Sequence, residues 1–139
     1  MRTIDSIDIH CAATPEGKHF TVDDIRRWHR AQGWVDVGYH YVITLDGEVQ
    51  PGRPVDQVGA HCPQKRMNHV SIGICYIGGC AEDGKTPKDT RTPAQKIALK
   101  SLVKKLRSKY GIPVERVFGH KDFAPKACPS FDVHAESWD

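Results

Sequence analysis

The chain has 139 residues, of which 39% are hydrophobic and 27% are charged. This composition excludes a disordered chain, a collagen and a coiled coil, and the length fits a single domain over residues 1–139. No segment approaches the roughly 18 apolar residues of a membrane span, so we expect no membrane insertion. The formal net charge of +3 is mildly basic, and because Lys and Arg form no long run we expect no nucleic-acid partner.

The cysteines and the first residues indicate the compartment. The cysteine count of five is odd and no CxxC pair occurs, which argues against a disulfide scaffold. The first ten residues, MRTIDSIDIH, contain acids and lack the apolar stretch of a signal peptide. We therefore expect synthesis in a reducing cytoplasm, and we expect a monomer.

The first half of the chain predicts a strand, a helix and a hairpin. Residues 3–11 are rich in Ile with partial alternation, which is typical of a strand. Thr21 begins a capping-box pattern that opens a helix, and Gly33 suits its end. Residues 39–45 are aromatic and β-branched, and Asp46-Gly47 predicts a tight turn into residues 48–50. The residues expected on the inner face of the helix are Val22, Ile25, Trp28 and, as a further candidate, His29.

The second half predicts a buried strand, the longest helix and a short strand. Residues 70–77 are nearly all apolar, as in a central strand buried on both faces, and residues 78–91 are polar, as in a surface loop. Thr92-Pro93 caps a helix that ends at Gly111, and residues 114–119 form the last strand. The expected apolar stripe of this helix is Ile97, Leu99, Leu102, Val103, Leu106 and Tyr110. This order predicts an α/β domain with one sheet flanked by helices.

Two histidines and one cysteine are the candidates for chemistry. His10 and His120 each stand at the end of a predicted strand, where α/β proteins build their sites. Cys128 follows His120 in a loop bounded by Pro125 and Pro129. Two imidazoles and a thiolate suit zinc, and three protein ligands leave a position open, as in catalytic zinc sites. The spacing alone also permits two ordinary histidines and a buried thiol.

Six segments of the sequence give evidence that the spacing of single residues does not. They occur in order along the chain: HCAAT (10–14), QGWVDVGYHYVI (32–43), NHVSIGICYIGG (68–79), TPAQ (92–95), GHKD (119–122) and APKACPSFD (124–132). Together they resemble the phage-lysozyme branch of the zinc N-acetylmuramoyl-L-alanine amidases, the type 2 amidase family. Peptidoglycan recognition proteins share the fold of that family, so the resemblance implies a central mixed β-sheet flanked by helices.

The resemblance implies a role for five residues, none of which departs from the family pattern. His10, His120 and Cys128 match the zinc ligands, and Tyr39 and Lys126 match the tyrosine and lysine that catalysis requires. The implied reaction is hydrolysis of the amide between N-acetylmuramic acid and L-alanine in peptidoglycan. The implied setting is that of a phage or prophage endolysin, which waits in the host cytoplasm and acts on the cell wall after release.

Other residues carry weaker expectations. His40 is expected to pack or to hydrogen-bond on the opposite side of its strand from the site. His61 and His69 are expected to border the substrate groove, and Asp122 or Asp132 to orient a ligand histidine.

Two alternatives to an enzyme of this kind stay open. One is a peptidoglycan-binding module without turnover, against which the intact Tyr39, Lys126 and Cys128 argue. The other is an added regulatory role, because some members of the phage-lysozyme branch bind and inhibit the phage RNA polymerase. Only nine residues precede His10, which is short for that role.

Overall fold

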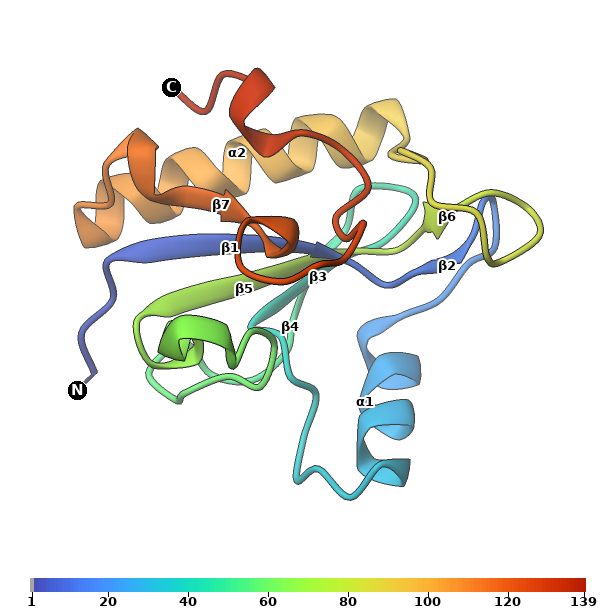
Figure 1. Ribbon diagram of the computed structural model, residues 1–139, viewed down its shortest axis with the longest axis horizontal. Coiled ribbons are helices and arrows are strands. Elements are labelled where there is room, and N and C mark those ends of the chain that lie inside the picture. The colour runs from blue at the N-terminus through green and yellow to red at the C-terminus, as the bar shows by residue number, and fades with distance from the viewer. Residues whose placement is uncertain (1) are drawn as a thin grey trace.

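The computed structural model describes residues 2–139, and its centre is a five-stranded sheet (Figure 1). The strand order is β4-β3-β5-β1-β7, with β3, β5, β1 and β7 parallel and β4 antiparallel to β3. A second, small sheet pairs β2 with β6. The strands are β1 (Ser6–Cys11), β2 (Thr14–Pro15), β3 (Tyr41–Ile43), β4 (Val49–Pro51), β5 (Ser71–Tyr76), β6 (Gly79–Cys80) and β7 (Val117–Gly119). The prediction of an α/β domain with a mixed sheet is confirmed.

Two helices lie on opposite sides of the sheet (Figure 1). They are α1 (Val22–Ala31) and α2 (Pro93–Tyr110), and four short 3₁₀ segments complete the fold: Gln64–His69, Val114–Arg116, His120–Asp122 and Val133–Ala135. Both helices begin with the expected capping box, in which Thr21 and Thr92 accept from the backbone N–H three residues later. Gly111 ends α2 in the left-handed conformation. These caps satisfy backbone donors that would otherwise lack partners.

The alternation of β1 sorts its side chains between the two faces of the sheet. Ile7 and Ile9 pack with Leu99 and other apolar residues of α2 in the larger core. Asp8 and His10, which alternate with them, point to the opposite face. A smaller apolar cluster, which includes residues of α1, lies there beside them. The sheet therefore has an apolar α2 face and a partly polar face that carries His10.

The structure corrects several details of the elements and buried residues expected from the sequence. Ile97 is 73% exposed, because it lies about 200° around the helix from the buried Leu99. Trp28 is 37% exposed and makes a T-shaped contact with Phe20 instead of joining the inner face of α1. The segment 78–91 is not all surface loop, since its buried start forms β6. Residues 114–116 form a 3₁₀ turn, so β7 is shorter than predicted.

The remaining general expectations concern thiols and membrane spans. All five cysteines are free, which agrees with the expectation that no disulfide scaffold is present. Between residues 2 and 139, neither helix has the length and apolar character needed to cross a bilayer.

Candidate active site

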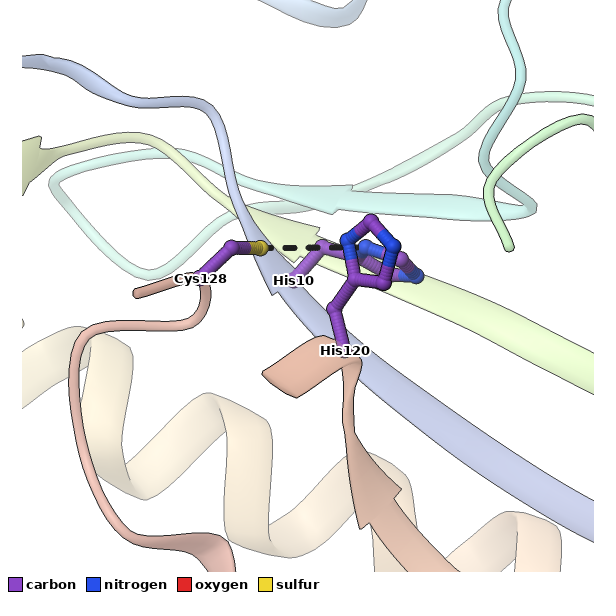
Figure 2. Close-up of side chains that lie close together, drawn as sticks. All are labelled: His10, His120 and Cys128. Carbon is purple, nitrogen blue, oxygen red and sulfur yellow. Dashed lines mark hydrogen bonds between the residues drawn. The ribbon is translucent and has the colours of Figure 1, made fainter. Parts of the chain in front are cut away.

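Three donor residues meet at one edge of the sheet, although two of them lie more than 100 residues from the third. His10 is the penultimate residue of β1, and His120 directly follows β7, the parallel neighbour of β1. The carboxyl ends of parallel strands share an edge, which brings the two imidazoles together. Cys128 completes the group from the following loop (Figure 2). One ligand atom from each residue lies within 4.8 Å of the others, and His10 Nδ1 is 3.8 Å from Cys128 Sγ.

The loop that carries Cys128 is held by hydrogen bonds on both sides of the thiol. The Lys121 N–H donates to the Cys128 carbonyl at 2.9 Å, and the Tyr76 hydroxyl donates to the Pro129 carbonyl at 2.6 Å. The Cys11 N–H donates to Cys128 Sγ itself at 3.2 Å. A backbone donor aimed at sulfur stabilises a thiolate, which is the form that binds metals.

The pKa shifts of His120 and Cys128 bear on how the donor group would bind a cation. Burial and the neighbouring His10 lower the pKa of His120 to about 4, so its imidazole is neutral at pH 7 and keeps a free lone pair. The adjacent Cys11 thiol and burial raise the pKa of the Cys128 thiol, so its ionisation needs a positive partner. Two neutral imidazoles and one thiolate are ligands that zinc accepts, and they leave room for a fourth ligand.

Asp8 and His61 lie behind His10, and neither of them was expected from the sequence to contact His10. His61 Nδ1 is 2.9 Å from His10 Nε2, and the Asp8 Oδ2 atom is 3.5 Å from the same nitrogen. Asp8 is 0% exposed, and neither of its carboxylate oxygens has a hydrogen-bond partner among residues 2–139. The signal for Asp8 was present in the sequence, as a carboxylate two residues before His10 in a strand otherwise rich in Ile.

A hollow of about 290 Å³ opens in front of the donor group. Tyr39 and Lys126 line it together with the three donor residues. The Tyr39 ring lies 5.2 Å from the His10 ring, and burial raises the pKa of its phenol well above 10, so the hydroxyl stays protonated at neutral pH. Lys126 is exposed and lines both this hollow and an adjoining one of about 410 Å³. The two hollows share Trp34 and His61 as well, so they lie side by side.

Comparison with known proteins assigns this arrangement to a family. Residues 1–131 match the family described as N-acetylmuramoyl-L-alanine amidase. The chain belongs to this amidase family.

Similar sequences and solved structures agree with that assignment. The amidase is 47% identical to an endolysin of Enterobacteria phage T3, over 94% of this chain and 83% of the relative, and 47% identical to an endolysin of Escherichia phage T7, over 93% and 82%. Among solved structures, the N-acetylmuramoyl-L-alanine amidase LysC of Clostridium intestinale superposes with a TM-score of 0.80 at 29% identity, covering 96% of this chain and 85% of that one. Drosophila PGRP-LB gives 0.78 at 26% identity, covering 97% and 79%.

The other histidines of the amidase take different places. His40 is buried, accepts from the Gly73 N–H at 3.0 Å through Nδ1 and lies 2.8 Å from the Gln57 carbonyl through Nε2, so the expected hydrogen bond is confirmed. Its expected place on the opposite side from the site is wrong, because its ring lies 5.8 Å from that of His61. His61 lines the hollows as expected, but His69 is exposed and lines neither of them.

The expectation that Asp122 or Asp132 orients a ligand histidine is wrong. Asp122 accepts from the Gly119 N–H and pairs with His134. Asp132 caps the 3₁₀ segment Val133–Ala135. Both carboxylates therefore interact with the C-terminal segment and not with a candidate ligand. The carboxylate that lies beside a candidate ligand is that of Asp8.

Proposed function

We propose that this amidase depends on zinc held by His10, His120 and Cys128, with Tyr39 and Lys126 as its catalytic residues. The reaction of the family is hydrolysis of the amide that joins N-acetylmuramic acid to L-alanine in peptidoglycan. The observation that carries the proposal is the convergence of two imidazoles and one thiol, within 4.8 Å, at the floor of an open hollow.

The chemistry divides between the metal and the side chains around it. When bound, zinc supplies a Lewis acid that lowers the pKa of water toward ~7 and polarises the amide carbonyl. The protonated phenol of Tyr39 donates a hydrogen bond to the carbonyl oxygen as negative charge develops there. The Lys126 ammonium adds positive charge to the lining of the hollow. Tyr39 and Lys126 are also the two candidates for giving the leaving amine its proton.

The similarity to phage endolysins supports action on the bacterial cell wall. We place synthesis in the host cytoplasm and cleavage after release from it. Inhibition of a phage RNA polymerase is a separate prediction from the sequence resemblance, and a pull-down with the cognate polymerase tests it.

Cleavage of purified peptidoglycan separates the enzyme from a recognition module. Mass spectrometry of the products is expected to show stem peptides with a free L-alanine amine. Activity is expected to disappear with a chelator and to return with added zinc. Binding to peptidoglycan without any release of peptide, at any zinc concentration, would favour the recognition module.

A further inference from the structure

The two nitrogens of His10 face different surroundings, and only one of them can carry the hydrogen of a neutral imidazole. Nδ1 faces Cys128 and the proposed metal position, whereas Nε2 faces His61 and Asp8. For Nδ1 to offer its lone pair to a metal, the hydrogen must lie on Nε2. The neighbours of Nε2 therefore decide whether His10 is ready to bind.

A chain of hydrogen bonds leads from Nε2 of His10 to a backbone carbonyl. His10 Nε2 is 2.9 Å from His61 Nδ1, and His61 Nε2 is 3.3 Å from Ser71 Oγ. The chain ends where Ser71 Oγ donates to the Met67 carbonyl oxygen at 2.5 Å.

The direction of every bond in this chain follows from its last member. A carbonyl oxygen only accepts, so the Ser71 hydroxyl hydrogen points to Met67. Ser71 Oγ then accepts from His61 Nε2–H, which leaves a lone pair on His61 Nδ1. That lone pair accepts from His10 Nε2–H.

We propose that the Met67 carbonyl, acting through Ser71 and His61, holds His10 as the Nε2–H tautomer and so keeps Nδ1 free for a metal ion. His61 and Ser71 are positioning residues in this arrangement, and the proposal rests on the metal site of the proposed function. Asp8 favours the same tautomer electrostatically, because its carboxylate oxygen lies 3.5 Å from Nε2 and an N–H at that position is more favourable than a second lone pair, although no hydrogen bond forms.

Two glycines let the His61 ring reach this place. A Cβ on Gly73 would lie 2.6 Å from Cγ and Cδ2 of His61, and a Cβ on Gly59 would lie 2.7 Å from Cδ2. The backbone of His61 is also fixed, since its N–H donates to Asn68 Oδ1 at 2.9 Å. The ring is thus confined by its surroundings and is not free to turn away from His10.

The tautomer can be measured in the wild-type protein without any metal. We expect long-range ¹⁵N–¹H correlation spectra of the histidine-labelled, metal-free amidase at neutral pH to show His10 and His61 both as Nε2–H tautomers. An Nδ1–H tautomer at either residue would overturn the proposal.

A matched pair of substitutions tests the link to the metal. His61→Asn keeps an acceptor where Nδ1 stands, because Asn Oδ1 is the same number of bonds from the backbone, whereas His61→Leu fills similar space without an acceptor. In competition with a chromogenic chelator, His61→Leu is expected to bind zinc about 10–100-fold more weakly, and His61→Asn to recover most of that loss.

The outcomes distinguish this proposal from the proposed function. Equal zinc affinity of His61→Leu and wild type would overturn the positioning role while leaving the metal site intact. A wild-type protein that binds no zinc would instead overturn the metal site, and the wild-type spectra would still decide the tautomer of His10.

Discussion

The two faces of the central sheet are built from alternate residues of the same strands, yet different forces hold them. On the α2 face, Ile7 and Ile9 join a core of aliphatic side chains that needs no particular partner atom. On the other face, Asp8 and His10 lie buried among polar groups whose contacts come from loops far along the chain. One face is stabilised by removing apolar area from water, and the other is organised by individual hydrogen bonds.

The difference teaches that stability and chemistry can be separated within one strand. A substitution on the α2 face should reduce the free energy of unfolding and leave the site's ligand set intact. A substitution in the donor group should abolish the chemistry at little cost in stability. The predictions below test this separation, and the largest effects come first.

Cys128→Ser removes the soft ligand and is expected to lower peptidoglycan cleavage by about 1,000-fold or more. Loss of metal-assisted catalysis is worth several kcal/mol, and each 1.36 kcal/mol is tenfold in rate. Release of stem peptides, followed by mass spectrometry, measures it. Urea unfolding of the metal-free variant should match that of metal-free wild type. A variant that keeps wild-type activity would exclude Cys128 as a required ligand.

Leu99→Ala opens a cavity on the α2 face, where Leu99 is almost fully buried. The free energy of unfolding is expected to fall by about 2–5 kcal/mol, through lost burial and the unfilled space. Zinc bound per folded chain should stay at the wild-type value. A loss of zinc from the folded variant would mean that the two faces are coupled.

Acid should destabilise the metal-free protein through its buried histidines. Burial lowers the pKa of His40 to about 4 from an ordinary 6.5, so the unfolded chain binds more protons than the folded one between these values. Stability is therefore present above about pH 6.5 and falls as the pH drops toward 4. The loss from this one residue is about 2 kcal/mol at pH 5.

Urea unfolding at pH 7 and pH 5 measures that loss, and His40→Asn is the control. Asn Oδ1 can still accept from the Gly73 N–H, but the side chain does not titrate. Between pH 7 and pH 5, the variant should lose less free energy of unfolding than wild type, and the difference should equal the contribution of His40. The pKa values of His61 and His120 are also lowered and account for a remaining slope. An unchanged slope would contradict a neutral His40 in the folded state.

Ile97→Ser gives the smallest expected effect, within about 0.5 kcal/mol in the free energy of unfolding, because this side chain is largely in water. It is the matched counterpart of Leu99→Ala on the same helix. Thermal unfolding of the two variants side by side checks the contrast. A large loss of stability in Ile97→Ser would mean that this face of α2 is covered in the folded protein.

The sequence predicted the α2 face better than the site face, for a physical reason. Periodicity and capping residues identify elements locally, so Thr92 and the buried stripe around Leu99 were foreseen. Ile97 was misplaced because an apolar residue was assigned to the stripe without regard to its angle around the helix.

The donor group depended on the family resemblance, because spacing along the chain says nothing about residues brought together by the fold. Strand ends and donor chemistry made His10, His120 and Cys128 candidates, the resemblance selected them as ligands, and the structure brings them within 4.8 Å. The contact of His61 with His10 could not be foreseen. His61 reaches it from a loop, and Gly73 leaves the space for that ring.

Zinc K-edge X-ray absorption of the loaded wild-type enzyme tests the proposed metal site most directly. The account predicts about one zinc per chain, with one sulfur at ~2.3 Å and two imidazole nitrogens at ~2.0 Å among four neighbours. A zinc environment without sulfur, or full cleavage activity in a protein free of metal, would contradict it.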